Sequence, residues 1–310
     1  MSDAPGGRSG PRIGRFAPSP TGPLHFGSLV AALASVCDAR AHGGRWLVRI
    51  DDVDEPRAVP GAERDIVATL ARYGFVHDGA IVRQSERATH YDAALHALDA
   101  RGLTYACACT RRDLDAAPLS SAGERVYPGT CRDGIPRERA RHAQRSLRVR
   151  VGAATIDFVD RLQGAQRQDL AREVGDFVVR RADGLAAYQL AVVVDDAEQR
   201  VTHVVRGADL LASTPRQIHL QRALGVPTPS YLHVPVAIDA SGEKLSKQTH
   251  ARALADDPLP TLCAAWSFLE QPAFEPTTLA GFWTHALRAW TPSRLPPVRM
   301  LPAPRFAYAV

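Results

Sequence analysis

A histidine that follows a tight turn is the first residue in the chain with an evident chemical use. Residues 18–23 contain three Pro and one Gly, which enforce a rigid, non-helical turn. His25 comes next, where the free N–H groups and positive partial charge of a helix N-terminus would suit phosphate. Gly27 would let a ligand approach the backbone, and His25 would donate hydrogen bonds to phosphate oxygens. For His25 alone, a tight loop with a capping histidine is an equally good interpretation.

The position of lysine is the second signal. Of 38 basic side chains only two are lysines, Lys244 and Lys247, and both lie in the loop at residues 242–248. Ammonium groups on flexible stems can follow and neutralise a moving pyrophosphate, a task that suits them better than the rigid fork of Arg. A solvated surface turn is the alternative. Codon bias explains the excess of Arg but not the clustering of Lys.

Three of the five cysteines lie close together in the sequence, at Cys107, Cys109 and Cys131. Without a secretion signal, this cluster favours a metal site over a disulfide framework. Three thiolates and one further ligand would complete a tetrahedral zinc site. Three free thiols in a reducing cytosol are the alternative. Cys37 and Cys263 fall in predicted helices and are expected to be small core residues.

A parallel sheet is the element that would bring these groups together. The sequence predicts strands at residues 12–17 and 45–50, and the spacing of apolar residues predicts a helix between them, over residues 25–42. A strand, a helix and a strand in this order are typical of parallel α/β proteins. Asp51 directly follows the second strand, and ligands of open parallel sheets bind at the carboxyl ends of strands. Further helices are predicted at residues 61–74, 86–101, 214–224 and about 255–290. Apolar runs occur at residues 177–179, 190–194 and 201–205.

Composition excludes several classes of protein. With 45% hydrophobic and 23% charged residues the chain is globular rather than disordered, and its 310 residues suggest about two domains. No stretch approaches the about 18 apolar residues of a membrane span. Residues 1–11 lack an apolar core and read as a disordered leader rather than a signal peptide. The net charge of +5 mildly favours a polyanionic partner, and the Arg-dense residues 132–150 are either a phosphate-contacting face or a solvated helix.

The two signals together carry a resemblance to a known family. Residues 18–28 (PSPTGPLHFGS) resemble the HIGH signature of class I aminoacyl-tRNA synthetases, and residues 244–248 (KLSKQ) resemble their KMSKS signature. The order and separation of the two fit the glutamyl subgroup, as do the strings at residues 49–54, 201–207, 214–219 and 231–235. The resemblance covers about residues 12–250. Ser28 stands where many relatives have a second His, and Asp51 where relatives usually carry Glu.

The resemblance implies ATP-dependent activation of glutamate through an adenylate, followed by transfer to a tRNA. His25, Lys244 and Lys247 would be the catalytic residues that stabilise charge on the phosphates, with Mg²⁺ on the nucleotide. The implied ATP-binding residues are Pro18, Ser19, His25, Gly27, Ser28, Lys244 and Lys247. The implied glutamate-binding residues are Arg15, Phe16, Ala17, Pro18, Ser19, Asp51 at the ammonium group, and Tyr188 and Arg206 at the side chain. Bidentate pairing of Arg206 with a carboxylate would favour glutamate over glutamine; a surface ion pair is its alternative role.

A narrower resemblance concerns the cysteines and the length. The Cys-x-Cys, Tyr-x-x-x-Cys pattern is similar to the zinc site of the glutamyl-Q tRNA(Asp) synthetases, a truncated family of the glutamyl subgroup. It implies one structural zinc on Cys107, Cys109, Tyr127 and Cys131. About 60 residues follow residue 248, too few for an anticodon-binding domain. The resemblance therefore implies ATP, L-glutamate and tRNA(Asp) carrying queuosine as partners of a cytoplasmic monomer. Conventional charging of a tRNA 3′ end and a non-catalytic module that binds tRNA or glutamate are the alternatives.

The predicted fold is α/β: a Rossmann-like parallel-sheet catalytic domain, split by a zinc-containing insertion and followed by a small helical region resembling a stem-contact segment, with no anticodon-binding domain. The predicted segments are a leader (1–11), the first half of the catalytic domain (12–103), an insertion resembling an acceptor-binding subdomain (104–175), the second half with the Lys loop (176–254) and a helical C-terminal region (255–310).

Overall fold

The start of the chain forms the predicted strand, helix and strand. The computed structural model describes residues 11–53, 58–120, 123, 125–141, 144–245 and 251–308, so Lys247 and nearly all of the predicted leader lie outside the described residues. Strand β1 (Ile13–Phe16) pairs in parallel with β2 (Arg45–Ile50), and β2 pairs in parallel with the short β3 (Val82–Arg83). Helix α1 (Phe26–Arg40) connects β1 to β2 and is buried on most of its surface.

The connection from α1 to β2 depends on a glycine. A methyl group at Gly44 would lie 2.2 Å from the carbonyl oxygen of Arg12, so no larger residue fits between helix and strand. This close approach allows β2 to start directly beside β1, with Ile13 opposite Arg45. The register fixes Phe16 and Asp51 near the same edge of the sheet, which is the edge where ligands of parallel sheets bind.

A second sheet continues the first. Its strand order is β7-β6-β10-β9, and β9 (His203–Gly207) pairs in parallel with β10 (Ser230–Val234). Strand β9 lies beside β1, because the backbone N–H of Thr202 donates to the Ile13 carbonyl at 2.9 Å. Helices α6 (Tyr188–Glu198) and α7 (Thr214–Leu224) pack against each other next to this sheet, and Gly225 ends α7 with φ of 71°. The apolar run at residues 190–194 therefore lies within a helix.

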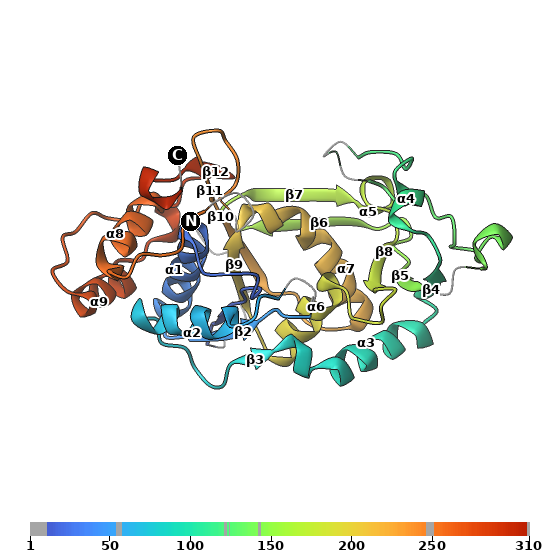
Figure 1. Cartoon of the computed structure of the whole chain (residues 1–310), viewed down its shortest axis with the longest axis horizontal. Helices are drawn as coiled ribbons and strands as arrows, with labels where there is room; N and C mark the ends of the chain where they lie inside the picture. Colours follow the sequence, from blue (N-terminus) through green and yellow to red (C-terminus); the bar gives the residue numbers. More distant parts are fainter. Residues whose placement is uncertain are drawn as a thin grey trace.

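A small antiparallel sheet forms the far end of the molecule, at the right of Figure 1. It consists of β4 (Thr104–Cys107), β5 (Ser146–Val149) and β8 (Phe177–Arg180). The hairpin of β6 (Thr155–Asp160) and β7 (Gly164–Asp169) runs from this end toward β10, with which β6 pairs in parallel. The predicted segment boundaries stay predictions. Strands β5 and β6, which belong to the predicted insertion, pair with β8 and β10, which belong to the predicted second half of the catalytic domain. The two predicted segments therefore share sheets.

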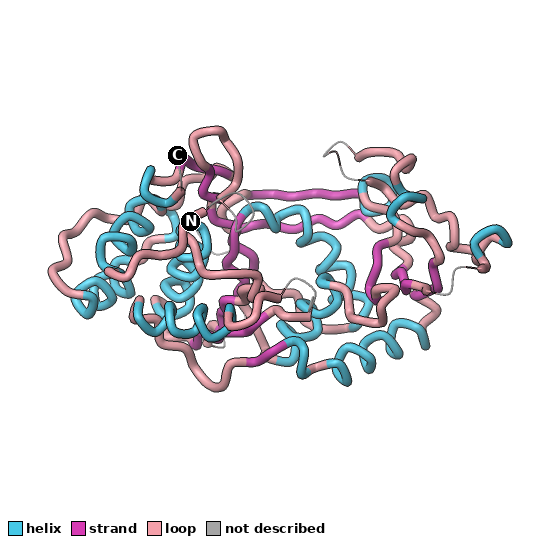
Figure 2. Tube along the Cα trace, viewed as in Figure 1, coloured by secondary structure: helices cyan, strands magenta, loops and turns pink. Residues whose placement is uncertain are grey.

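The remaining helices complete the fold. The predicted helices of the first half correspond to α2 (Ala62–Arg72) and α3 (Ala88–Ala100), and short helices α4 (Arg111–Leu114) and α5 (Leu170–Glu173) lie near the small sheet. Toward the C-terminus, α8 (Pro258–Phe268) packs on α1 and on α9 (Leu279–Ala289). Strand β12 (Met300–Pro302) then returns to pair with β11 (Val236–Ile238), as Figure 2 shows near the label C. Among the helices that the structure describes, none has the length and apolar character needed to cross a bilayer.

Candidate active site

A cavity of about 530 Å³ opens at the carboxyl ends of β1, β2, β9 and β10, in front of the first turn of α1. Parallel strands end here side by side, which is the usual ligand position in such sheets. All the described residues that the sequence nominated for ATP and glutamate line this cavity. They are Arg15, Phe16, Ala17, Pro18, Ser19, His25, Gly27, Ser28, Asp51, Tyr188, Arg206 and Lys244. Their roles stay predictions.

The turn before α1 forms the part of the cavity predicted for phosphate. His25 is the N-cap of α1 in extended conformation, and the backbone N–H of Asp51 donates to the Pro18 carbonyl at 3.0 Å, which holds the turn against the end of β2. A methyl group at Gly27 would lie 3.2 Å from the imidazole carbon Cε1 of His25. Glycine at this position therefore keeps the His25 ring and the helix N-terminus accessible from the same side.

A buried cluster of charges supports the part predicted for the amino acid. Arg49, fully buried behind the cavity, donates from Nε to Asp51 Oδ1 at 2.7 Å and from Nη1 to Asp196 Oδ1 at 2.7 Å. Arg15 Nε donates to the same Asp196 carboxylate at 3.3 Å. Burial raises the pKa of Asp51 to about 6, against the opposing effect of the Arg49 guanidinium. Asp51 is thus charged at neutral pH and becomes protonated in mildly acidic solution.

Two of the three guanidinium nitrogens of Arg206 are bound to protein side chains, and the third is open. Its Nε donates to His233 Nε2 at 3.0 Å, and its Nη2 donates to Thr214 Oγ1 at 2.9 Å and Gln217 Oε1 at 2.8 Å. Its Nη1 is buried and has no hydrogen-bond partner among the described residues. A buried guanidinium nitrogen without a partner is costly unless a ligand pairs with it. Because Arg206 lines the cavity, a carboxylate in the cavity is the ligand that its chemistry suits.

Lys244 lies at the edge of the cavity, in the loop after β11. Its Nζ forms an ion pair with Asp209 Oδ2 at 2.6 Å, and Asp239 accepts hydrogen bonds from the backbone N–H groups of Ser241 and Glu243, which shapes the turn before it. Asp209, Asp196 and His233 were not among the site residues predicted from the sequence. Asp209 had a usable signal, since it follows the end of the apolar run at residues 201–205 by only a few residues.

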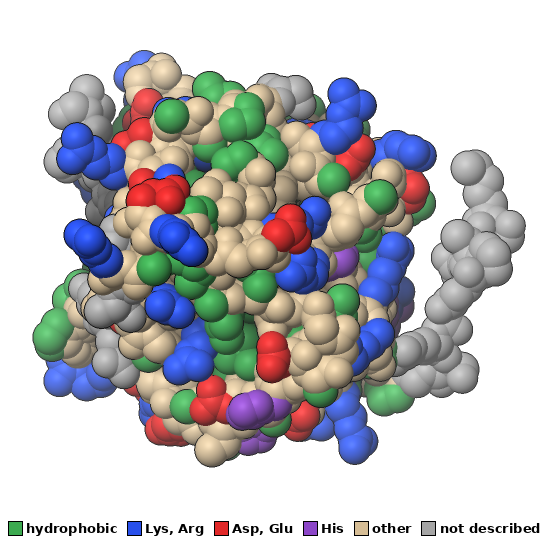
Figure 3. All heavy atoms as spheres, turned by 90° about the vertical axis from the view of Figure 1, so that its right-hand side faces the viewer, with side chains coloured by type: hydrophobic (Ala, Val, Ile, Leu, Met, Phe, Trp, Pro, Cys, Tyr) green, Lys and Arg blue, Asp and Glu red, His purple; other side chains and the backbone are tan. Residues whose placement is uncertain are grey.

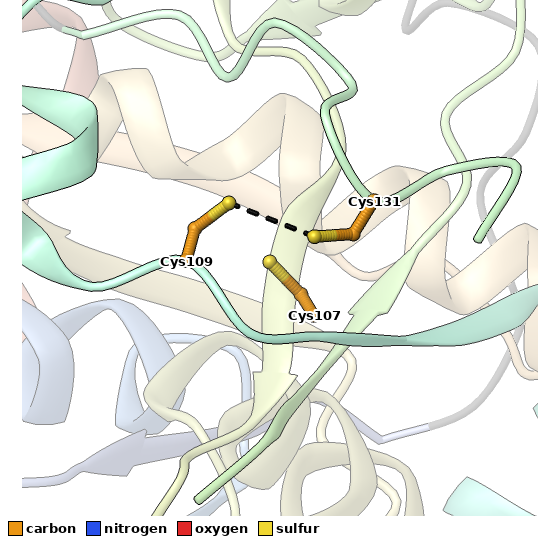
Figure 4. Close-up of side chains that lie close together, drawn as sticks. All are labelled: Cys107, Cys109 and Cys131. Atoms are coloured by element: carbon orange, nitrogen blue, oxygen red, sulfur yellow. Dashed lines mark hydrogen bonds between the residues drawn. The ribbon is translucent and has the colours of Figure 1, made fainter. Parts of the chain in front are cut away.

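The predicted zinc ligands lie together at the end of β4, as Figure 4 shows for the three cysteines. Cys109 Sγ is 3.7 Å from Cys131 Sγ, and Tyr127 Oη is 3.4 Å from Cys107 Sγ and 4.0 Å from Cys109 Sγ. A tetrahedron with Zn–S bonds of about 2.3 Å has sulfur–sulfur edges of about 3.8 Å. The donor set and its spacing therefore fit one zinc ion.

Arginines surround this cluster. Arg148 donates from Nε to Cys107 Sγ at 3.3 Å and stacks 3.7 Å from the centre of the Tyr127 ring, and Arg139 Nη1 donates to Cys109 Sγ at 2.8 Å. Burial opposes ionisation of Cys107, but the hydrogen bonds from Tyr127 and Arg148 lower its pKa to about 7. The guanidinium of Arg148 thus favours the thiolate of Cys107, which is the form that binds metal, whereas burial and the neighbouring sulfur atoms raise the pKa of Cys109 to about 11.

The Arg-dense segment is thus only partly available to RNA. Arg132 pairs with Asp176 at 2.6 Å, and Arg150 lies over the ring of Tyr105. With Arg139 and Arg148 at the cysteines, the arginines of residues 132–150 that remain exposed are Arg137, Arg141 and Arg145. Figure 3, which views this end of the molecule, shows basic side chains spread over the face with acidic ones between them.

Residues 13–291 match the family described as tRNA synthetases class I (E and Q), catalytic domain. The chain belongs to this family and is a ligase of the class I aminoacyl-tRNA synthetase type. Curated relatives at 56% to 62% identity carry the name Glutamyl-Q tRNA(Asp) synthetase. The relative from Burkholderia cenocepacia strain J2315 is 60% identical over 289 residues, which cover 89% of this chain and 95% of the relative. The relative from Aromatoleum aromaticum is 56% identical over 285 residues, which cover 91% and 89%.

A solved structure is similar in fold. The glutamate tRNA ligase from Elizabethkingia meningosepticum superposes with a TM-score of 0.79 at 24% sequence identity, covering 96% of this chain and 68% of that chain. At this level of identity the likeness concerns the fold alone. Together with the family match over residues 13–291, it confirms the prediction of a class I synthetase catalytic fold with a parallel sheet.

Proposed function

We propose that the chain activates L-glutamate with ATP to glutamyl-adenylate and transfers the glutamate to queuosine at the wobble position of tRNA(Asp). The observation that carries the choice of amino acid is Arg206, which lines the cavity and whose buried Nη1 has no hydrogen-bond partner in the part of the chain that the structure describes. The choice of queuosine and tRNA(Asp) is supported by the name of the relatives, which match this chain over 89% to 95% of their own length.

The amino acid would lie across the carboxyl ends of the strands. Arg206 and Tyr188 would contact the side chain, where the guanidinium pairs with the γ-carboxylate. Asp51 would accept from the ammonium group, and Arg15 with the backbone of residues 16–19 would contact the rest of the molecule. A glutamine amide in the same place could offer Arg206 only one uncharged carbonyl oxygen, so it would lose the ion pair and one of the two acceptor oxygens, which disfavours glutamine.

The nucleotide would lie over the N-terminus of α1. Its phosphates would meet His25, the backbone around Gly27 and Ser28, and the ammonium groups of Lys244 and Lys247, while Mg²⁺ would arrive with the ATP. An oxygen of the glutamate α-carboxylate attacks the α-phosphorus, and pyrophosphate leaves. No side chain acts as a nucleophile, so the protein contributes position and charge stabilisation.

The second step needs only a hydroxyl held at the adenylate. A queuosine hydroxyl attacks the acyl carbon, AMP leaves with the bonding electrons, and the hydroxyl proton passes to solvent or to the departing phosphate. Cys107, Cys109, Tyr127 and Cys131 would hold zinc in a structural role, because these residues lie at the small-sheet end and do not line the cavity.

Two measurements test the proposal. In ATP–pyrophosphate exchange without tRNA, glutamate and not glutamine should support exchange. Labelled glutamate should then attach to tRNA that contains queuosine, including tRNA without its 3′-terminal adenosine, and not to queuosine-free tRNA. Labelling that persists without queuosine, or that disappears with the terminal adenosine, would favour conventional charging. Absence of exchange would contradict both enzymatic functions.

A further inference from the structure

Three buried polar side chains form a continuous chain behind the cavity. Asp160 at the end of β6 contacts His233 of β10, and His233 contacts Arg206 of β9. The two contacts are short: His233 Nδ1 lies 2.6 Å from Asp160 Oδ2, and His233 Nε2 lies 3.0 Å from Arg206 Nε. The exposed fractions of Asp160, His233 and Arg206 are 1%, 0% and 5%. Water is therefore excluded from these contacts, and their donors and acceptors must match.

The chemistry of Arg206 determines where the proton of His233 lies. A guanidinium N–H can only donate, so His233 Nε2 must carry the lone pair and Nδ1 the proton. The Nδ1–H then donates to Asp160 Oδ2. The other oxygen, Asp160 Oδ1, accepts from the backbone N–H groups of Leu162 at 3.0 Å, Gln163 at 2.9 Å and His233 at 3.2 Å.

His233 is neutral in this arrangement. Burial lowers its pKa to about 4, although Asp160 acts in the opposite direction. A neutral imidazole that donates at one nitrogen and accepts at the other has one acceptor to offer to Arg206. The carboxylate of Asp160 selects which nitrogen that is.

The consequence is a fixed orientation of the Arg206 guanidinium. With Nε bound to His233 and Nη2 bound to Thr214 and Gln217, the plane of the group has no freedom, and Nη1 remains for a ligand. We propose that Asp160 and His233 are positioning residues that lock the tautomer behind Arg206 and thereby set the preference of the cavity for a carboxylate over an amide. This inference rests on the proposed function, in which Arg206 pairs with the glutamate side chain.

Asp160→Asn is the sharpest test, because it keeps the shape of the side chain. The three backbone N–H groups need an oxygen, so the amide NH₂ of the new side chain must face His233 Nδ1. Nδ1 then has to accept, Nε2 has to carry the proton, and a donor faces the Arg206 N–H. Asp157→Asn is the matched control, since Asp157 lies on the same strand, is exposed and forms only a surface ion pair with Arg167.

The expected result separates the two substrates of the activation step. Asp160→Asn should raise the KM for glutamate at least tenfold in ATP–pyrophosphate exchange and lower the ratio of glutamate to glutamine activity by a similar factor. The KM for ATP should change less than twofold, and Asp157→Asn should match the wild type in all three. An unchanged glutamate KM in Asp160→Asn, or an equal rise of both KM values, would overturn the inference.

A measurement that needs no activity completes the test. Nitrogen-15 NMR of the histidine side chains, with His233 assigned from its absence in His233→Gln, should show a neutral Nδ1–H tautomer in the wild type. The opposite tautomer, or an imidazolium at pH 7, would overturn the inference even if Asp160→Asn does not fold.

His233→Gln can still accept from Arg206 and should bind glutamate better than His233→Leu; equal binding would contradict the proposed contact. Failure of the proposed function looks different, since the wild type would then show no glutamate-dependent exchange whatever its tautomer.

Discussion

Buried charges that share partners determine the behaviour of single residues in the site. Arg49 contacts three carboxylates, at 2.7 Å for Asp51, 2.7 Å for Asp196 and 3.6 Å for Asp195. Arg15 and Arg87 also pair with Asp196 at 3.3 Å and with Asp195 at 2.6 Å, so each carboxylate has a guanidinium partner, but desolvation still penalises the charged form of each. Asp51 is the member of the group that lines the cavity, and its pKa is raised accordingly. An ammonium group in the cavity would be a second positive partner for Asp51, beside Arg49.

Glutamate activation should therefore depend on pH near 6. The Asp51 carboxylate, with a pKa of about 6, must be charged to pair with the substrate ammonium. Below that pH, kcat/KM for glutamate should fall by about tenfold per pH unit, and it should level off above pH 7. ATP–pyrophosphate exchange between pH 5 and 8 measures this limb. Asp51→Asn should be poorly active at every pH and should not show the fall in kcat/KM below pH 6. A wild-type pH profile in that variant would contradict the role of Asp51.

The same shift has an opposite effect on folding stability. The pKa of Asp51 is higher in the folded chain than the ordinary 3.8, so between about pH 4 and pH 6 the folded state binds the extra proton. The contribution of Asp51 to stability is thus greatest at low pH and is lost as pH rises through 6. Thermal melting should show Asp51→Asn gaining stability relative to the wild type on going from pH 4.5 to pH 7. A loss of relative stability in this variant would mean that Arg49 lowers the pKa of Asp51 by more than burial raises it.

At the scale of elements, the sequence correctly predicted the turns, helices and strands that depend on neighbouring residues. The turn at residues 18–23, helix α1 and strand β2 are confirmed because Pro, Gly and apolar spacing act within a few residues. The run at residues 190–194 carried no such information. It is buried on all sides in α6, so its apolar residues show no helical period, and packing against α7 decides its structure. The contact between Asp160 and His233 joins residues 73 positions apart and has no local signal at all.

The small sheet should depend on its metal. The three cysteines connect the end of β4 to the loop before β5, so zinc would add a cross-link to the β-pairing and side-chain contacts that already join these elements. We expect about one zinc per purified chain, and Cys131→Ser should lose the metal and melt at a lower temperature. Metal analysis and thermal melting measure both effects. Cys263→Ser, on helix α8, is the control and should keep the zinc; a wild type with almost no zinc would favour free thiols.

The loop that carries both lysines should serve the phosphates and not the amino acid. Lys244→Ala and Lys247→Ala should each lower the rate of adenylate formation about 10²-fold, the usual effect of removing one charge-stabilising group. The KM for glutamate should change little, because Lys244 lies at the edge of the cavity beside Asp209. Lys244→Arg should recover only part of the rate, since the planar fork follows moving phosphates poorly. Full recovery would make the choice of Lys in this Arg-rich chain a coincidence.

At the scale of the whole molecule, the cavity is built from residues between 15 and 245 on several different elements. Its lining could be nominated from the sequence because the motifs of the family mark those positions. The residues behind the lining, such as Asp196 and His233, could not, since their value lies in contacts that exist only once the sheets have formed. The availability of the arginines was equally unpredictable, because it depends on which of them the cysteine cluster and Asp176 occupy.

Binding of tRNA should be electrostatic and should involve the small sheet end. The net charge is +5, and Arg137, Arg141 and Arg145 are exposed in the segment between Cys131 and β5. Each phosphate contact on flexible RNA changes the slope of log affinity against log salt by about 0.7. Replacing all three arginines with Gln should therefore weaken tRNA binding and reduce that slope by about two units, while tRNA-independent ATP–pyrophosphate exchange stays at the wild-type rate. Filter binding between 50 and 300 mM salt measures the slope. If affinity and slope are unchanged, tRNA contacts another face; if exchange falls as well, the substitutions have damaged the fold rather than an RNA surface.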